Sequence, residues 1–387
     1  MIGKIMHWKE RLMGRLWRII QNTSLLRSWR IYDAVEAEKE VGRSVENFQI
    51  LWPAQRISLE PTGNDREFLK ISKYFNDGFY SRPNIFVCEV PQAYCHIGTG
   101  LVCTPDFKAI SDSQMEYRLA YNHNFKWFKP ERPQRLAGSH YATINNVFTP
   151  YWLHWLFDCL PRIYSLYKAY PGQRIVLLVP DEMGRSWHDS LDSLLPPNFE
   201  IQRLPSNKWV QVDRLLLASY AAARANGHIP VEYYEFMRQT VFARFGLPPK
   251  NEPRERIYVS RALTTHCRIL NEEQLIELLS RYGFKSVVLE KLDFRKQVEL
   301  FHRAEVVVSP YGSSWGNLVW AGKIKIFILY PDRPPETHVF TYAKALGQEH
   351  FFLAGKESSA WSDFTVDLGE VENVLKNEMG LRPVASA

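Results

Sequence analysis

Short apolar runs alternate with amphipathic segments from about residue 150 onward, and this alternation constrains the fold more than any other feature. Predicted helices lie at about 152–168, 184–195 and 231–245, and predicted strands at 174–179, 199–204 and 212–218. Strands that alternate with helices predict a parallel sheet covered by helices. The last of these helices ends at Gly246, a residue suited to the left-handed turn after a helix.

A proline-rich connector at 247–253 separates this series from a second one of the same kind. The second series has predicted strands at 256–260, 286–289, 306–309 and 324–329, and predicted helices at 271–281, 294–304 and 314–321. The sequence therefore predicts an α/β protein with two Rossmann-like domains that face each other across a cleft. In such folds, ligands bind at the carboxyl ends of the strands.

The N-terminal third follows other patterns. Residues 45–125 hold short β-like runs broken by Pro, Gly, Asn and Asp, which predict a small β-rich cap. Residues 2–20 repeat apolar side chains at three- and four-residue spacing, with basic residues largely elsewhere, which predicts a basic amphipathic helix. We expect a basic segment at 1–35, an N-terminal domain at 36–246 that includes the cap, and a C-terminal domain at 247–387.

The positive charge is concentrated at the N-terminus. The whole chain has a net charge of +6, yet its first 30 residues hold seven basic residues against one acid. A nucleic-acid binder would carry basic charge along a groove of its folded body, so we expect no nucleic-acid partner. The basic helix can lie on an anionic membrane surface, or it can dock on its own domain or on a partner.

Cysteine use and hydropathy indicate the compartment. The five cysteines are scattered, and none is part of a CxxC pair, so we interpret them as reduced thiols of a cytosolic protein. Neither a run of about 20 apolar residues nor a signal peptide is present. These features predict a cytoplasmic protein, peripheral at the inner membrane if the basic helix binds lipid.

One apolar segment, 151–162, carries three polar side chains at four-residue spacing. His154, Asp158 and Arg162 share one face if the helix runs through, and polar groups in so apolar a stretch need partners. Pro161 kinks or restarts the helix, but His154 and Asp158 still share a face. A histidine with a carboxylate one turn later can deprotonate a hydroxyl, the carboxylate orienting the ring. The alternative is a histidine satisfied within the core.

The second series carries features typical of anion binding. Arg261 directly follows a strand, so its guanidinium should emerge at the carboxyl edge of the sheet. Arg268 can complete a fork on phosphate oxygens, or it is an ordinary surface residue. Residues 306–317 run from strand through a glycine turn into a helix, which presents backbone amides to an anion. Glu290 can accept hydrogen bonds from ribose hydroxyls, or it is a solvated acid beside Lys291.

At these motifs the sequence resembles glycosyltransferase family 61, which includes bacterial capsular-polysaccharide enzymes and eukaryotic xylosyl- and N-acetylglucosaminyltransferases. The resemblance covers about residues 140–331. Its most specific parts are HWLFDCLPR at 154–162, YVSR at 258–261, LEKLDFRKQVELFHRA at 289–304 and SPYGSSWGN at 309–317.

The resemblance implies an inverting enzyme of the GT-B arrangement, with a nucleoside-diphosphate sugar as co-substrate, no other cofactor and no obligatory metal. It also implies a glycan or lipid-linked acceptor in surface or capsular polysaccharide synthesis, bound on the N-terminal side, with the sugar donor on the C-terminal side. The residues so implied are Asp158 and His154 for catalysis; Arg162 and Trp155 for the acceptor; and Arg261, Arg268, Glu290, Gln297, Tyr311, Gly312, Ser313, Ser314 and Asn317 for the sugar donor.

Two departures from the family pattern leave alternatives open. Tyr311 stands where the family usually has histidine, and Ile328 stands where it usually has glutamate. Tyrosine can still donate a hydrogen bond to phosphate, whereas isoleucine removes a charge. A catalytically inactive relative that binds a glycan or nucleotide sugar as an assembly subunit is therefore the alternative. A nucleotide-dependent oxidoreductase is disfavoured, because GTGLVC at 98–103 lacks the third glycine of a dinucleotide fingerprint.

Overall fold

The computed structural model describes residues 34–58, 79–114, 132–222, 228–249, 254–331, 338–356 and 362–384. The predicted basic helix at 2–20 lies outside these residues, as does the 1–35 segment apart from Ala34 and Val35, which form strand β1. Within the described ranges, none of the helices has the length and apolar character needed to cross a bilayer.

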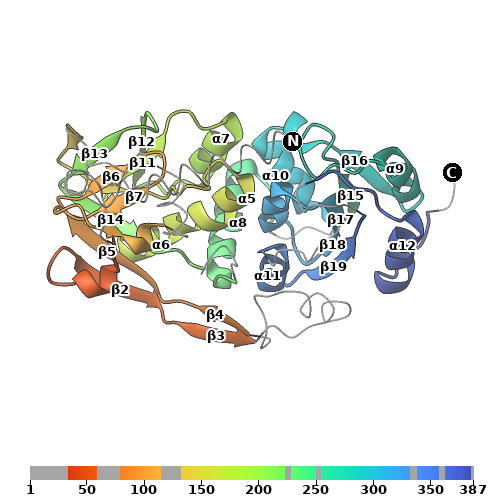
Figure 1. The fold of residues 1–387 in the computed structure, drawn as a ribbon, viewed down its shortest axis with the longest axis horizontal. Coiled ribbons are helices and arrows are strands. Elements are labelled where there is room, and N and C mark those ends of the chain that lie inside the picture. Colours follow the sequence, from red (N-terminus) through yellow and green to blue (C-terminus); the bar gives the residue numbers. More distant parts are fainter. Residues whose placement is uncertain are drawn as a thin grey trace, which may run out of the picture.

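The N-terminal part, on the left of Figure 1, is built on a six-stranded sheet. In spatial order its strands are β12 (Phe199–Leu204), β11 (Ile175–Pro180), β10 (His140–Ala142), β14 (Arg214–Ala218), β5 (Ile85–Pro91) and β2 (Glu46–Trp52). The first four are parallel, and their spatial order reads 3-2-1-4 in chain order. This is half of a doubly wound sheet, whose strand order reverses between β10 and β14.

Antiparallel strands extend this sheet at one edge, so part of the expected β-rich cap is continuous with the α/β sheet. β5 pairs antiparallel with β14, and β2 with β5, so both strands belong to the α/β sheet. The alternation of side chains explains why: Val87 faces the helices, whereas Phe86 and Cys88 face the opposite side. That opposite face packs on a second six-stranded sheet. The strands of the second sheet are β1, β8 (Ala109–Ile110), β7 (Leu101–Cys103), β6 (Tyr94–His96), β13 (Trp209–Val212) and β9 (Gln134–Leu136).

Helices cover the other face of the first sheet, close to the predicted positions. They are α5 (Trp152–His154), η3 (Trp155–Cys159), α6 (Pro161–Ala169), α7 (Arg185–Leu194) and α8 (Val231–Phe245). The first three form one continuous run through a wider π turn, in which Leu160 N donates to Trp155 O, and Pro161 opens α6, where its missing N–H costs little. Gly246 ends α8 with φ of 69°, as predicted.

The C-terminal part, on the right of Figure 1, contains five parallel strands. Their spatial order is β16 (Phe284–Val287), β15 (Glu255–Val259), β17 (Ala304–Pro310), β18 (Lys325–Tyr330) and β19 (Glu349–Ala354). This order reads 2-1-3-4-5, a doubly wound order whose switch point lies between β15 and β17. Ile326 and Ile328 face the core shared with the N-terminal part, whereas Phe327 and Leu329 face the outer helices.

The helices of this part match the sequence prediction with one correction. The helices and helical turns are α9 (Glu272–Ser280), η4 (Leu289–Lys291), α10 (Phe294–His302), η5 (Ser313–Trp320), α11 (His338–Ala345), α12 (Leu368–Asn373) and η6 (Val374–Glu378). The segment predicted as a helix at 314–321 is the 3-10 helix η5, which is tighter than an α-helix. α11, β19 and α12 carry no prediction from the sequence.

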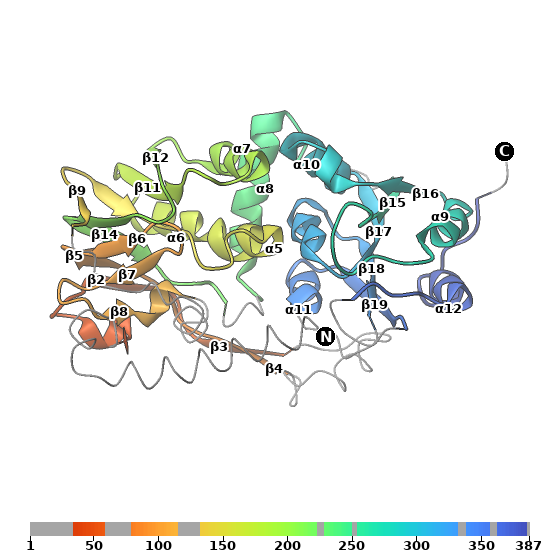
Figure 2. The same cartoon turned by 45° about the horizontal axis from the view of Figure 1, so that its top comes forward.

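The two parts meet through a continuous apolar core, and α5, α8, α10 and α11 lie between the two sheets in both views (Figures 1 and 2). Gly316 of η5 packs against α5 so closely that a Cβ there would lie 3.0 Å from Leu153 Cα and 3.2 Å from Trp152 O. Arg238 of α8 donates from Nε to Val319 O at 2.6 Å and also bonds Ala321 O, although burial lowers its pKa to about 10. A guanidinium of one part therefore caps a helix of the other.

Candidate active site

His154 and Asp158 form the hydrogen-bonded pair that their spacing predicts. His154 Nδ1 lies 2.7 Å from Asp158 Oδ2, across the π turn between α5 and α6. The Asp158 side chain is 3% exposed and that of His154 is 17% exposed, so the histidine is the member that solvent and ligands reach. With Nδ1 held by the carboxylate, the ring is fixed in tautomer and orientation, as a general base requires.

Asp158 lies at the junction of the two parts. Burial raises the pKa of Tyr234, on α8, and of Tyr342, on α11, and the negative charge of Asp158 raises both further. Phe157, its chain neighbour, stacks on Tyr342 with ring centroids 3.7 Å apart. The pair is thus held between elements of both parts, in a dry environment where electrostatic interactions are strong.

The structure places the two residues expected to contact the acceptor inside the protein, which corrects that expectation. Trp155 is fully buried, and its Nε1 donates to Ser190 Oγ at 2.8 Å. Arg162 is also fully buried; its Nε donates to Ala218 O at 2.9 Å, and the guanidinium lies over the ring of Tyr220. The π turn rotates Arg162 away from the face that His154 occupies. Both residues stabilise the fold beneath the pair.

Arg261 occupies the switch point of the C-terminal sheet, as its position after β15 predicts. A Cβ on Gly312, in the loop after β17, would fall 1.9 Å from Arg261 Nη1, so the absence of a side chain there makes room for the guanidinium. Nη2 donates to His266 O at 3.1 Å, within the loop that follows β15. Burial lowers the pKa of Arg261, yet a guanidinium stays charged at neutral pH.

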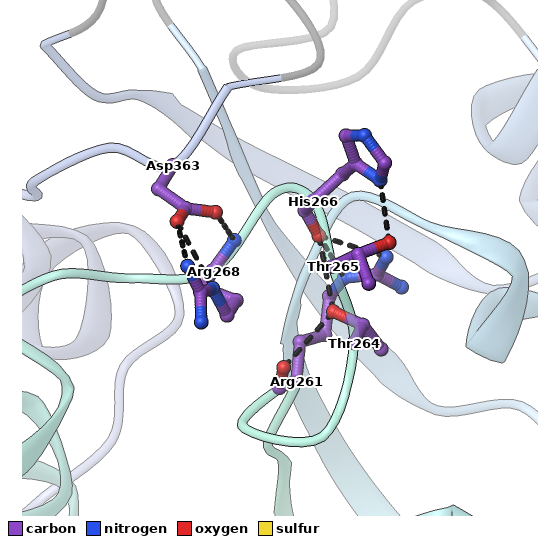
Figure 3. Close-up of polar contacts among 6 residues, drawn as sticks. All are labelled: Arg261, Thr264, Thr265, His266, Arg268 and Asp363. Carbon is purple, nitrogen blue, oxygen red and sulfur yellow. Dashed lines mark hydrogen bonds and ion pairs between the residues drawn. The ribbon is translucent and has the colours of Figure 1, made fainter.

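Arg268 does not complete a fork with Arg261. Its guanidinium bonds Asp363 through Nε at 2.9 Å and also through Nη2, and its backbone N donates to the same carboxylate at 3.0 Å. Figure 3 shows the two guanidinium groups with separate partners, Arg268 with Asp363 and Arg261 with the carbonyl of His266. The predicted second phosphate contact is thus engaged in an ion pair that links residues 95 positions apart.

Glu290 and Gln297 have different roles in the structure. Glu290 is exposed on the turn η4, and its charge acts on Arg261, raising the pKa that burial lowers. Gln297 is buried, and its Nε2 donates to Leu289 O at 3.2 Å and Leu292 O at 3.1 Å. Gln297 therefore fixes the turn that presents Glu290, which corrects its expected direct contact with the sugar donor.

The start of η5 borders Arg261. The ring of Tyr311 stacks on that of Tyr330, with ring centroids 5.2 Å apart. Ser313 and Ser314 are partly exposed. Within the described residues, neither Ser314 Oγ nor the Oδ1 of the buried Asn317 has a hydrogen-bond partner. Buried polar atoms normally bond to protein, water or ligand, so these two indicate capacity for a further polar group here.

Ile328, at the position where the family usually has glutamate, lies inside the core. Ile328 is fully buried on β18 and pairs in register with Ser309 of β17. Its side chain therefore supplies packing where the family usually has a carboxylate.

Close packing places the His154–Asp158 pair and Arg261 on neighbouring elements of the fold. Gly316 contacts Leu153, the residue before His154, and Gly312 contacts Arg261. The helix that carries His154 thus packs on η5, and Arg261 lies against the glycine that precedes η5. Phe148 and Tyr151, whose rings contact His154, are not among the residues identified from the sequence. Their aromatic side chains, six and three positions before His154, were the pattern that could have indicated these contacts.

Comparison with known proteins identifies the region that carries this site. Residues 152–328 match the family model Glycosyltransferase 61. The match begins with α5 and ends within β18, so it includes the His154–Asp158 pair, Arg261 and Gly312. No curated protein matches the chain. Residues 152–328 are therefore similar to glycosyltransferase family 61, and this similarity supports glycosyltransferase activity.

Proposed function

We propose that this protein is an inverting glycosyltransferase that moves a sugar from a nucleoside-diphosphate sugar to a hydroxyl of a glycan or glycolipid. The observation that carries the proposal is the His154–Asp158 hydrogen bond of 2.7 Å, together with the half-buried guanidinium of Arg261 at a sheet switch point, since η5 and the glycine before it contact both α5 and Arg261. One side supplies a base and the other a cation for a leaving diphosphate.

The reaction is a single in-line displacement. His154, through Nε2, takes the proton of the acceptor hydroxyl as the oxygen forms a bond to the anomeric carbon. The bond from that carbon to the diphosphate breaks, and its electron pair leaves with the diphosphate. Asp158 stabilises the imidazolium that results, and Arg261, with the amides at Ser313 and Ser314, stabilises the developing negative charge. Attack opposite the leaving group inverts the anomeric configuration.

The proposed architecture has two domains in the GT-B arrangement, 36–246 on the acceptor side and 247–387 on the sugar-donor side. The two doubly wound strand orders support this division. Charge stabilisation by Arg261 makes a bound metal ion unnecessary. Transfer should continue unchanged in excess EDTA, and a rate restored only by added Mg²⁺ or Mn²⁺ would contradict this.

We place the activity in surface or capsular polysaccharide synthesis at the cytoplasmic face of a membrane, with residues 1–30 as the peripheral contact. A variant lacking residues 1–30 should lose binding to anionic vesicles and keep its circular dichroism spectrum. Equal vesicle binding by both proteins would remove the membrane from the proposal.

The central test is a thermal-shift screen of the purified protein against nucleoside diphosphates and their sugars. A ligand at a hundred times its Kd stabilises the folded state by about 2.7 kcal/mol. We expect one nucleotide to raise the Tm selectively, Arg261→Ala to abolish that shift, and Arg174→Ala to keep it. Arg174 is the matched control because it forms an exposed ion pair with Glu200 at the start of β11. The sugar of the selected nucleotide is then tested for transfer to a panel of glycans. Absence of transfer to every glycan would overturn the proposal.

Tyr311 and Ile328 favour one alternative, a relative that binds a nucleotide sugar without transferring it. A buried isoleucine replaces a charge that the family pattern usually has, and nothing in its surroundings restores that charge among the described residues. A selective thermal shift together with no transfer by the wild type would support this alternative.

A further inference from the structure

The loop before α5 presents aromatic rings to the proposed base. Phe148 stacks on His154 with centroids 4.9 Å apart and an interplanar angle of 28°. Tyr151 meets the same imidazole edge-on, with centroids 6.2 Å apart and an angle of 79°. Tyr151 is 57% exposed, although the helix that it precedes is buried. A single exposed aromatic ring is ordinary on a protein surface, so the contact with His154 is what distinguishes Tyr151.

Hydrogen bonds fix this loop in one conformation. Asn146 Oδ1 accepts from Phe148 N at 2.7 Å, and Tyr151 N donates to Phe148 O at 2.8 Å. Trp187, on α7, donates from Nε1 to Thr149 O at 2.8 Å, which ties the loop to the sheet-covering helices. The rings are therefore held in place before any ligand arrives, and a preorganised surface binds with a smaller entropic cost.

An exposed ring beside a base suits a particular ligand class. A pyranose has hydroxyls around its rim and C–H bonds directed from its faces. Those hydrogens are weakly positive, whereas the face of an aromatic ring is negative, so the two surfaces attract and exclude water between them. Stacking on the ring of Tyr151 leaves the rim hydroxyls at the level of the neighbouring imidazole.

We infer that Tyr151 is the acceptor platform of this site and stacks on the pyranose ring whose hydroxyl His154 deprotonates. Phe148 is a positioning residue, because its ring stacks on the imidazole and also contacts the ring of Tyr151. This inference rests on the proposed function and names the acceptor class that the site takes. It also replaces Trp155 and Arg162, which the structure buries, as the source of acceptor contacts.

The nucleobase of the sugar donor is a second flat ligand that can stack on an aromatic ring. The structure favours the acceptor, because Tyr151 belongs to the N-terminal part and adjoins His154, whereas Arg261 lies at the switch point of the C-terminal sheet. The experiment distinguishes the two by probing sugar rings and nucleosides separately.

The test measures saturation-transfer NMR of methyl β-glucopyranoside, methyl β-galactopyranoside and methyl β-xylopyranoside with the full chain, with uridine and guanosine as nucleoside probes. Sorbitol is the control ligand, since it has similar hydroxyls and no ring face. We expect at least one glycoside to bind, and Tyr151→Ala to weaken it tenfold or more. Tyr151→Phe should stay within about twofold, because the ring face remains.

The control variant is Phe79→Ala, since Phe79 on β4 (Phe79–Arg82) is an aromatic residue with 37% of its surface exposed. It should bind the glycosides as the wild type does. Circular dichroism checks the fold of each variant, and Tyr151→Phe separates loss of the ring from loss of the fold.

Three outcomes would overturn the platform: no glycoside binding by the wild type, equal binding by Tyr151→Ala, or a nucleoside as the ligand that depends on Tyr151. With transfer established, Tyr151→Ala should raise the acceptor KM tenfold or more and leave the KM of the sugar donor unchanged. Absence of transfer by the wild type would instead contradict the proposed function, so the two failures are distinguishable.

Discussion

The molecule contains two switch points of the same topological kind, and they are filled differently. In the N-terminal sheet, the crevice between β10 and β14 is occupied by Asn145, Arg162 and Tyr220, all buried. In the C-terminal sheet, the corresponding place between β15 and β17 holds Arg261 beside a glycine, with Ser313 and Ser314 partly exposed. Strand order decides where a crevice can form, and the side chains decide whether it stays available to a ligand.

The physical difference lies in where each arginine finds its partners. Arg162 donates to carbonyls of both strand-end loops, Asn145 O at 3.3 Å and Ala218 O at 2.9 Å, and so closes its crevice from within. Among the described residues, the guanidinium of Arg261 donates to one loop carbonyl, His266 O, and lies against Gly312. The first arginine is built into the fold, whereas the second retains donors suited to a phosphate.

The largest effect should follow from Asp158→Asn. This variant tests whether the His154–Asp158 pair of the N-terminal part, whose sheet crevice is filled, takes part in the reaction. An amide cannot stabilise the imidazolium, so kcat should fall by about 10²–10⁴-fold. The nucleotide-induced thermal shift should persist, because the sugar-donor side is unchanged. Steady-state transfer at saturating sugar donor measures the effect, with Asp192→Asn, from an exposed ion pair with Arg203, as the control. A kcat within tenfold of wild type would remove Asp158 from the mechanism.

Arg162→Met should lower the free energy of unfolding by about 2–6 kcal/mol, since two buried carbonyls each lose a donor at about 1–3 kcal/mol. Urea denaturation monitored by tryptophan fluorescence measures this. Arg174→Met, at an exposed ion pair with Glu200, should leave the free energy of unfolding nearly unchanged. If Arg162→Met were as stable as the control and lost acceptor binding, the N-terminal crevice would be a ligand site after all.

Gly312→Ala should weaken nucleotide binding about tenfold, which corresponds to about 1.4 kcal/mol. Its φ of 164° is extended backbone open to alanine, so the added methyl acts by displacing the Arg261 guanidinium and not by straining the chain. Isothermal titration with the nucleotide selected by the thermal screen gives the Kd. Gly322→Ala is the matched control, because no heavy atom lies within 4 Å of its added Cβ. Equal Kd values for the two variants would mean that Arg261 does not contact the nucleotide.

Arg268→Ala should have the smallest effect. The Arg268 side chain is 48% exposed in its ion pair with Asp363, so its loss should change the free energy of unfolding little and leave the nucleotide Kd within about twofold. Chemical denaturation and titration calorimetry measure the two quantities. A tenfold weaker nucleotide complex would restore Arg268 as a phosphate ligand that leaves Asp363 on binding.

Local patterns predicted much of the α/β framework. Helix α8 and its end at Gly246 follow from apolar periodicity and a left-handed glycine, and the His154–Asp158 contact follows from helical spacing. Arg261 at the sheet edge follows from its place directly after a strand. Each of these inferences depends on residues close together in the chain.

The errors concern contacts between distant residues. No local pattern pairs Arg268 with Asp363, or adds β5 to the sheet beside β14. The burial of Arg162 depends on a π turn, which helical spacing does not anticipate, and on two loop carbonyls far along the chain. Periodicity also did not distinguish the 3-10 helix η5 from an α-helix, because eight residues sample too few turns.

The contact at Gly316 bears on how such enzymes can be recombined. A chimera that joins the N-terminal part of one relative to the C-terminal part of another, with the crossover between α8 and β15, would pair η5 with a foreign α5. The added bulk of any other residue at position 316 would meet backbone there, and Arg238 would lose or clash with its carbonyl partners. Exchangeable modules of this protein should therefore follow its packed surfaces. A graft of the C-terminal part must carry α5 and α8 together with η5, although α5 ends at His154 and η5 begins only at Ser313.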